Sequence, residues 1–305
     1  MPVSKIPAFG WENCARIAND HAELLVTLDV GPRILSYKLP DGENVLQPTA
    51  DQMGTTGEKE FVARGGHRIW VSPETDLTYT PDNDAVTYDT QEPNGLRVET
   101  PAGTSGVRKE MLISMSTGSS AVKILHRATN VGTAPLTIAT WGLTVVAPHG
   151  VEIIPQPPLG KHGEEYLPNR IIVPWTYTDF SDDRWKFGRK YWTLTPKAGR
   201  PPTKLGFAHI SKWAGYLLGS TLFLKTVDHD PSAQYPDFGC NYETFTQGDM
   251  IELETLSPLR MVEPGECVEH TETWHLFGGL PAIDPLDETS LDRGLQPALQ
   301  QLGFL

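Results

Sequence analysis

Short runs in which apolar and polar residues alternate recur along most of the chain. They cover residues 22–29, 33–38, 106–116, 120–129, 136–146, 216–227, 249–256 and 267–277. A period of two residues is the pattern of a β-strand that buries one face. Segments rich in Gly, Pro and Asn separate the runs, as at 39–42, 130–133 and 263–265. The pattern therefore predicts an all-β protein in which antiparallel strands form a sandwich or a barrel.

One region near the C-terminus has the spacing of a helix instead. Within residues 287–303, leucines recur at helical intervals, at Leu291, Leu295, Leu299 and Leu302. Pro297 falls inside this pattern, so we expect the helix to begin or to kink there.

Residues 148–202 are rich in proline and aromatic residues and are only weakly periodic. A long irregular segment inside a compact domain is usually functional or disordered, and the aromatic content argues against disorder. Two interpretations remain open: a loop packed on a sheet edge, or a wall over a ligand site. We expect the basic and aromatic run 184–192 to border the ligand cleft, where it would suit an anionic sugar.

Apart from this long irregular insertion, predicted strands follow one another from about residue 20 to residue 277. We therefore expect residues 1–305 to form a single domain, with residues 278–305 as a C-terminal tail packed against it.

The composition excludes several classes of protein. The 305 residues are 39% hydrophobic and 21% charged, which is too apolar for a disordered chain and too polar for a membrane protein. The formal net charge of −13 argues against nucleic acid and anionic membranes as partners. Residues 1–16 lack the apolar stretch of a secretion signal, so we expect a cytoplasmic protein, with its oligomeric state left open.

The sequence favours neither a metal nor a cofactor. Cys14, Cys240 and Cys267 are too scattered for a disulfide framework or a zinc ribbon. His270 and His275 would point to opposite faces of one strand, and the nine histidines show no spacing typical of metal ligands. No glycine-rich motif for a phosphate or a dinucleotide is present.

Several fragments, taken in order, resemble the galactose mutarotase-like superfamily, which includes the aldose 1-epimerases. Residues 28–37 resemble the first hairpin of those enzymes, and residues 65–74, Gly-Gly-His-Arg-Ile-Trp-Val-Ser-Pro-Glu, resemble the signature of the DUF4380 family within it. Residues 241–246, 251–256 and 264–274 follow in the family's order. The resemblance, which covers roughly residues 20–277, implies a β-supersandwich of antiparallel sheets with a short C-terminal helix, and a carbohydrate or sugar acid as the ligand.

The resemblance also indicates candidate catalytic residues. Leu253-Glu254-Thr255 is similar to the fragment that carries the catalytic glutamate of mutarotases, which makes Glu254 the candidate base. The strand that supplies the general acid histidine in mutarotases matches residues 136–143, which contain no histidine. His67 is therefore the candidate for a displaced acid, sharing a concave pocket with Glu254 and Arg68.

Other residues are candidates for substrate binding. Glu252 alternates with Glu254 and should share its face, where two carboxylates would raise one pKa. Arg68 offers a planar fork of donors, and Trp70, on the same face, can stack on a sugar. The remaining candidates are Glu74, Trp141, Lys225, Asp237 and Glu243.

Three functions fit these residues. The first is an enzyme of the aldose 1-epimerase type that converts a sugar or sugar acid by proton transfer. The missing histidine favours a carbohydrate-binding protein without catalysis. A lyase or a glycoside-processing enzyme on the same scaffold is the third possibility.

Overall fold

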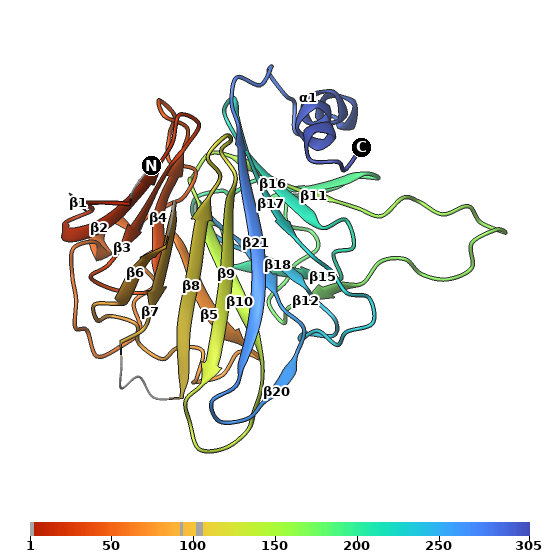
Figure 1. Cartoon of the computed structure of the whole chain (residues 1–305). Helices are drawn as coiled ribbons and strands as arrows, with labels where there is room; N and C mark the ends of the chain where they lie inside the picture. The colour runs from red at the N-terminus through yellow and green to blue at the C-terminus, as the bar shows by residue number, and fades with distance from the viewer. Residues whose placement is uncertain (1–2, 92–93, 102–105) are drawn as a thin grey trace.

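The computed structural model describes residues 3–91, 94–101 and 106–305. Within these ranges the chain forms two antiparallel β-sheets, packed face to face, and one α-helix near the C-terminus (Figure 1). The prediction of an all-β antiparallel sandwich with a short C-terminal helix is thereby confirmed.

The first sheet contains eleven strands within the described ranges. Its strand order is β1 (Ser4–Ala8), β2 (Trp11–Ala18), β3 (Glu23–Thr27), β4 (Arg33–Lys38), β5 (His67–Ser72), β10 (Leu136–Val146), β19 (Met250–Leu256), β18 (Tyr242–Gln247), β15 (Thr203–Phe207) and β12 (Ile172–Pro174). A further strand, β20 (Arg260–Val262), pairs with the first residues of β10. Strands from both ends of the chain therefore meet in the middle of this sheet.

The second sheet contains ten strands, again counted over the residues that the structure describes. Its order is β13 (Trp185–Phe187), β14 (Tyr191–Leu194), β11 (Val151–Pro155), β16 (Trp213–Leu218), β17 (Thr221–Val227), β21 (Cys267–Phe277), β9 (Val122–Asn130), β8 (Val107–Met115), β7 (Gly95–Glu99) and β6 (Thr87–Gln91). A short 3₁₀ helix, η1 (Ala50–Gln52), lies in the connection between β4 and β5.

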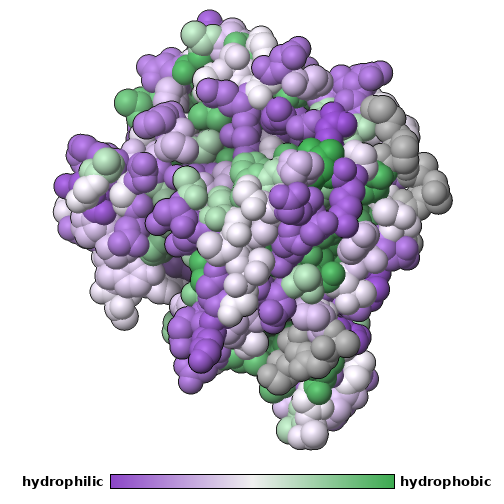
Figure 2. Space-filling model, turned by 90° about the vertical axis from the view of Figure 1, so that its left-hand side faces the viewer, coloured by the Kyte–Doolittle hydropathy of each residue, from purple (hydrophilic) through white to green (hydrophobic). Residues whose placement is uncertain are grey.

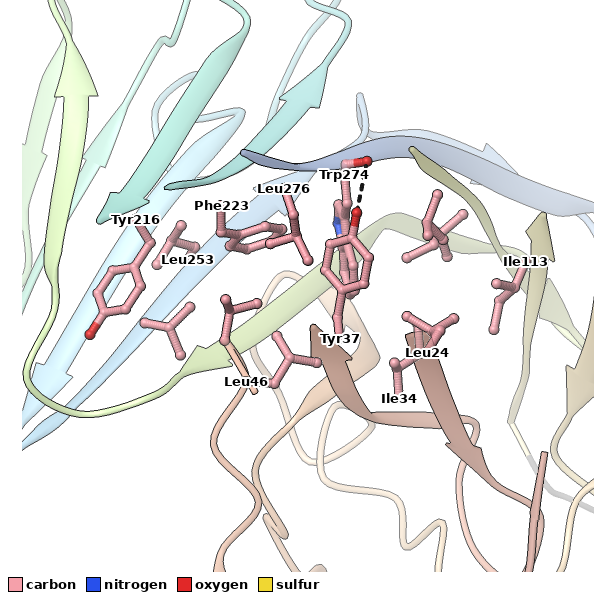
Figure 3. Packing of buried hydrophobic residues seen from close by; sticks show 14 of the residues in the cluster. Leu24, Ile34, Tyr37, Leu46, Ile113, Tyr216, Phe223, Leu253, Trp274 and Leu276 are labelled. Atoms are coloured by element: carbon pink, nitrogen blue, oxygen red, sulfur yellow. Dashed lines mark hydrogen bonds between the residues drawn. The ribbon is translucent and has the colours of Figure 1, made fainter. Parts of the chain in front are cut away.

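The main hydrophobic core fills the space between the two sheets. Figure 3 shows Leu24, Ile34 and Tyr37 of the first sheet facing Phe223 and Trp274 of the second. The Tyr37 hydroxyl donates to the carbonyl oxygens of Ser120 and Trp274, at 2.5 and 3.4 Å. The buried Tyr37 hydroxyl therefore finds acceptors on the second-sheet side of the core, as a desolvated hydroxyl requires.

Alternation gives the middle strands of the first sheet two different faces. Ile69 of β5 and Leu253 of β19 point into the core between the sheets. Arg68 and Glu254, one residue away in each strand, point to the outer face of the sheet. The outer face of these strands is therefore polar although the strands themselves are buried.

Two glycines precede β5 and are required by the backbone. Gly65 and Gly66 have φ of +68° and +65°, in the left-handed region that favours glycine. A Cβ on Gly65 would overlap the carbonyl oxygen of Gln47, and one on Gly66 that of Ile34. The chain therefore makes a close backbone approach at this pair, and the approach fixes where β5 begins.

The C-terminal helix α1 (Glu288–Gln301) follows the leucine pattern. Asp287 caps it by accepting a hydrogen bond from the backbone of Thr289 at 3.0 Å. Leu291, Leu295 and Leu299 pack in a second apolar cluster against the second sheet. The expectation of a start at Pro297 is wrong, because the helix begins at Glu288 and contains Pro297 in its interior.

Residues 148–202 are more regular than their composition indicates, because they contain β11, β12, β13 and β14. The connection between β11 and β12 leaves the body of the molecule as a long loop, drawn in green at the right of Figure 1. Leu159, Tyr166 and Leu167 in this loop are exposed.

The surface on the side of β1–β4 is mostly hydrophilic or intermediate, and hydrophobic residues show there in separate small areas (Figure 2). No helix in the described part of the chain is long and apolar enough to span a membrane.

Candidate functional site

A pocket opens on the outer face of the first sheet, over its middle strands. Its volume is about 220 Å³. It is lined by residues of β5, β10, β15, β18 and β19 and of nearby loops: Phe61, Ala63, Arg68, Trp70, Glu74, Tyr79, Trp141, Leu143, Tyr177, Lys204, Phe245, Glu252 and Glu254. The structure thus brings together six of the predicted site residues: Arg68, Trp70, Glu74, Trp141, Glu252 and Glu254.

The strand register explains why Arg68 and Glu254 meet. Leu143 of β10 is the direct neighbour of Arg68 on one side and of Glu254 on the other. Glu252 lies two residues before Glu254 on the same face, as alternation predicts, and accepts a hydrogen bond from Arg68 Nη2 at 2.9 Å. The Arg68 guanidinium also lies over the Trp70 ring, 4.4 Å from its centroid.

Lys204 joins two buried carboxylates on the other side of the pocket. Its Nζ lies 2.8 Å from Glu254 Oε2 and 2.7 Å from Glu243 Oε2. Burial opposes the charge on Lys204, but Glu254 and Glu243 outweigh it and raise the lysine pKa. One ammonium cannot neutralise two carboxylates, and burial raises the pKa of both, that of Glu243 well above its usual range.

Glu254 is held firmly by one oxygen and free at the other. Trp141 Nε1 donates to Glu254 Oε2 at 3.0 Å, and Lys204 binds the same oxygen. Glu254 Oε1 is buried and has no hydrogen-bond partner among the described residues. A buried carboxylate oxygen without a partner is costly, so this atom is suited to accept a hydrogen bond from a ligand.

Aromatic rings form the walls of the pocket. Trp70 packs edge to face on Phe61, Tyr79 and Trp141, with centroids 5.2, 5.1 and 5.4 Å apart. Burial raises the pKa of Tyr79 and of Tyr177 to about 12, so both hydroxyls stay protonated donors at neutral pH. The Tyr79 hydroxyl donates to Glu74, which is exposed at the mouth of the pocket.

His67 does not share this pocket, which corrects the expectation from the sequence. It follows the glycine pair as Arg68 does, but adjacent residues of a strand point to opposite faces. His67 is buried between the sheets, where its Nδ1 lies 2.9 Å from Thr144 Oγ1 and its Nε2 lies 2.7 Å from His126 Nε2. Burial lowers its pKa well below the usual value, so the ring is neutral.

Lys225 also lies between the sheets and not in the pocket. Its side chain is fully buried on the face of β17 that belongs to the core. Its Nζ pairs with Glu272 Oε1 at 2.9 Å and donates to the carbonyl oxygen of Leu253 at 3.0 Å. Burial acts against the Glu272 carboxylate, but Lys225 and the nearby histidines outweigh it and hold the pKa of Glu272 below its usual range.

The same interior cluster contains the residues that can hold a metal. The ligand atoms of His67, His126 and Glu272 lie within 4.8 Å of one another. Two features favour a hydrogen-bonded cluster here: the Lys225 ammonium already neutralises Glu272, and the short distance between the two histidine nitrogens fits a hydrogen bond. Sequence spacing could not reveal this cluster, because β5, β9 and β21 each contribute one residue.

Two predicted residues lie behind or beside the pocket. Glu243 is buried under Lys204 and does not line the cavity. Asp237 is in a turn of strained backbone, with φ of +48° at Asp237 and +62° at Phe238. Its Oδ2 accepts from Ser72 Oγ at 3.5 Å, and its charge helps to raise the pKa of Glu243.

The run 184–192 does not line the pocket, so the expectation that it borders this cleft is wrong. Arg184 pairs with Asp182 at 2.6 Å, and Lys190 pairs with Asp292 of α1. Trp185 and Trp192 belong to the main core. Another part of the irregular segment takes the expected place: Tyr177 lines the pocket, and the Trp175 ring covers Lys204 at 4.6 Å.

Lys204 is the main residue that sequence reasoning missed. The signal was present, because Lys204 is a lone charge in a strand whose neighbours Thr203 and Leu205 point into the core. Its partners Glu243 and Glu254 come from two other strands, so their meeting depends on the order of strands in the sheet.

Solved structures with a similar backbone identify the fold. A galactose mutarotase-like protein from Clostridium acetobutylicum aligns over 90% of this chain and 98% of its own, with 10% identity and a TM-score of 0.56. A candidate aldose 1-epimerase from Escherichia coli K12 aligns over 87% of this chain and 99% of its own, with 14% identity and a TM-score of 0.54. A TPR-domain containing protein from Parabacteroides distasonis aligns over 88% of this chain and 47% of its own, with 13% identity and a TM-score of 0.58.

No protein-family model matches the sequence, and no curated protein matches it. At these low identities the structural likeness identifies a galactose mutarotase-like fold and does not by itself identify an activity.

Proposed function

We propose that this protein binds a monosaccharide in the outer pocket and converts it by proton transfer, as an aldose 1-epimerase-like isomerase. The observation that carries the proposal is Glu254, which lines a pocket walled by aromatic rings and whose buried Oε1 has no hydrogen-bond partner among the described residues. Sugars present apolar ring faces and hydroxyl groups, so aromatic walls with carboxylate and cationic side chains suit them. The neighbours from C. acetobutylicum and E. coli, a galactose mutarotase-like protein and a candidate aldose 1-epimerase, point in the same direction.

The geometry supports Glu254 as the base. In ring opening at the anomeric carbon, Glu254 Oε1 would take the proton of the anomeric hydroxyl, and the ring oxygen would gain one. The raised pKa of Glu254, caused mainly by burial, brings it closer to neutrality, where a general base works best.

In this proposal the proton donor differs from the histidine of the family that the sequence resembles. Residues 136–143 carry Trp141 into the pocket but no histidine, and His67 lies on the other side of the sheet. The donors that line the pocket are the Lys204 ammonium and the hydroxyls of Tyr79 and Tyr177. We assign the donation to the ring oxygen to this group, with Lys204 already hydrogen-bonded to the base.

The size of the pocket favours a single sugar ring. Pockets for drug-sized ligands have volumes of about 300–1,000 Å³. The 220 Å³ found here is smaller than that range. A lyase or glycoside-processing enzyme acting on a polymer would need a longer open groove, so this alternative is disfavoured.

A carbohydrate-binding protein without catalysis is the second candidate function. The tight ion pair between Lys204 and Glu254 favours it, because a base that is already hydrogen-bonded to a cation accepts protons less readily. The two candidates differ in anomer exchange, which only the enzyme accelerates.

The test compares anomer exchange with binding in the Glu254→Gln variant. The amide keeps the shape and the hydrogen bond from Trp141 but cannot accept the proton. We expect exchange, measured by NMR on a panel of aldoses, to fall about 10²- to 10⁴-fold while sugar binding persists. Glu12→Gln, at an exposed strand position, is the matched control and should exchange as the wild type does.

Exchange that survives unchanged in Glu254→Gln would contradict the assignment of the base. Sugar binding without accelerated exchange in the wild type would favour the binding protein instead. The narrower resemblance to the DUF4380 family, the cytoplasmic location and the single-domain organisation remain proposals, supported by the sequence features from which they were predicted.

A further inference from the structure

The charged groups that line the pocket do not balance. Glu74, Glu252 and Glu254 face two cations, Arg68 and Lys204, and three minus two leaves one negative charge. A sugar carboxylate or phosphate placed here would approach three carboxylates at close range. The pocket is therefore unsuited to the anionic sugar that the sequence suggested.

Glu74 is the carboxylate without a matching cation. Arg68 pairs with Glu252, and Lys204 pairs with Glu254 and Glu243. Within residues 3–91, 94–101 and 106–305, no lysine or arginine forms an ion pair with Glu74, which accepts a hydrogen bond only from the Tyr79 hydroxyl. An exposed carboxylate at the mouth of a pocket is open to a positively charged group of a ligand.

The rings beside Glu74 favour a cation as well. An aromatic face attracts a positive charge through its quadrupole. The Trp70 face is already occupied by the Arg68 guanidinium. Tyr79, which packs on Trp70 and Phe61, keeps 42% of its surface exposed. Glu74 and the exposed part of the Tyr79 ring therefore offer a negative charge and an aromatic surface to the same ligand group.

Deeper in the pocket, the structure supplies an acceptor for a neutral hydroxyl. Glu254 is fully buried, and its Oε1 has no partner in the described part of the chain. A sugar ring that donates a hydroxyl hydrogen to this oxygen would present its other substituents to the mouth, where Glu74 lies. Glu254 is thus suited to a hydroxyl group of the ligand, and Glu74 to a positively charged group of the same ligand.

We propose that the pocket selects an amino sugar, whose ring hydroxyl donates to Glu254 and whose ammonium group binds Glu74 beside the Tyr79 ring. This inference rests on the proposed function, because it names the class of monosaccharide that the same site takes. It replaces the anionic sugar with a cationic one.

Binding assays with related sugars of different charge test the proposal. D-glucosamine, D-glucose, N-acetyl-D-glucosamine and D-glucuronate, together with the corresponding galactose series, are titrated by ligand-observed NMR at mildly acidic pH. We expect the amine of one series to bind about 2- to 10-fold more tightly than its neutral parent, and the uronate to bind most weakly.

Substitution of Glu74 locates the effect. Glu74→Gln should bring the affinity for the amine down to that for the neutral sugar, and added salt should do the same in part. Asp76→Asn removes a charge from the same exposed segment without lining the pocket, so it should keep the preference of the wild type. Thermal unfolding of both variants checks that they are folded.

Three results would overturn the proposal: a uronate that binds as tightly as the neutral sugar, an amine with no advantage, or an advantage that persists in Glu74→Gln. Anomer exchange separates this failure from that of the proposed function. If neutral sugars exchange anomers but the amine binds no more tightly, the proposed isomerase activity is supported and the proposed selection of an amino sugar is rejected. If the amine binds more tightly but no anomer exchange is accelerated, selection of an amino sugar is supported and the isomerase activity is rejected.

Discussion

At the scale of single residues, Gly142 shows how tightly the site depends on the core behind it. Gly142 lies in β10 between Trp141 and Leu143, which both line the pocket. Its missing side chain would point to the opposite face, where a Cβ would overlap the Glu272 carboxylate. The interior ion pair of Glu272 and Lys225 therefore occupies the space that a larger residue would need.

We expect Gly142→Ala to lower the free energy of unfolding by about 1–3 kcal/mol, the usual cost of overpacking a core. Chemical denaturation measures the loss. Gly118→Ala is the control, because a Cβ on that exposed glycine meets nothing within 4 Å and its stability should change little. If the two variants are equally stable, the Glu272–Lys225 ion pair can shift to accommodate the added methyl group without loss of stability.

The residue scale also shows what alternation can and cannot predict. Glu252 and Glu254 share a face, as the period of two residues requires, and so do Arg68 and Trp70. The prediction that His67 shares the pocket with Arg68 is wrong, because the two are adjacent in the strand and the period of two residues places them on opposite faces. Alternation also places Lys225 and Phe223 on one face of β17, but which face of a strand belongs to the core depends on the other sheet.

At the scale of elements, β11 and β18 bring a buried acid together with two hydroxyls. Tyr242 and Thr244 of β18 donate to Glu152 of β11 at 2.5 and 2.6 Å. Burial, which outweighs these hydrogen bonds, raises the pKa of Glu152 to about 8. The folded protein therefore holds a proton on Glu152 at neutral pH, whereas the unfolded chain releases it near the ordinary glutamate pKa of about 4.3.

This difference gives stability a dependence on pH of known sign. Between the two pKa values the folded state binds more protons, so Glu152 favours folding at acidic pH and loses that contribution as pH rises towards 8. We expect Glu152→Gln, which mimics the protonated acid, to gain stability over the wild type by up to about 1.4 kcal/mol per pH unit.

Urea denaturation at pH 5 and pH 8 checks the expectation. The gain of Glu152→Gln should be small at the lower pH and large at the higher one. Parallel stability profiles of the two proteins would mean that Glu152 is ionised in the fold. The other titrating groups contribute equally to both proteins, so they cancel when the pH dependence of the variant is subtracted from that of the wild type.

Helices and strands can be predicted from the sequence where the pattern that forms them lies within a short stretch of the chain. The strands and the leucine pattern of α1 depend on periodicity and on a capping aspartate, Asp287, which are both visible in the sequence. The four strands within residues 148–202 were missed because proline and aromatic residues mask a period of two in short strands. Pro297 lies inside α1, where the neighbouring Leu295 and Leu299 pack in the apolar cluster against the second sheet.

At the scale of the whole molecule, the order of strands ties distant parts of the chain together. β5, β10 and β19 are neighbours in one sheet, although they come from three separate regions of the sequence. The core between the sheets includes residues from Ala15 to Leu276. This arrangement supports the proposal of a single domain, since no group of strands can separate with a core of its own.

We therefore expect a single cooperative thermal transition, with equal calorimetric and van't Hoff enthalpies. Removal of residues 278–305 should lower the midpoint of that one transition, because it uncovers the apolar side chains of Ile153, Leu222 and Leu224 under α1. Two resolved transitions in the full chain would contradict the single domain. A truncated chain with an unchanged midpoint would mean that the tail contributes no stability.

The position of Lys204 beside two tryptophans makes their fluorescence sensitive to what occupies the pocket. Its ammonium lies 4.6 Å from the ring centroids of both Trp141 and Trp175, and Trp141 also donates to Glu254. The emission of an indole ring depends on the charges and on the water around it. A ligand that displaces solvent or moves Lys204 therefore changes the intrinsic fluorescence of these two tryptophans, so the protein carries its own reporter of occupancy and binding can be followed without a label.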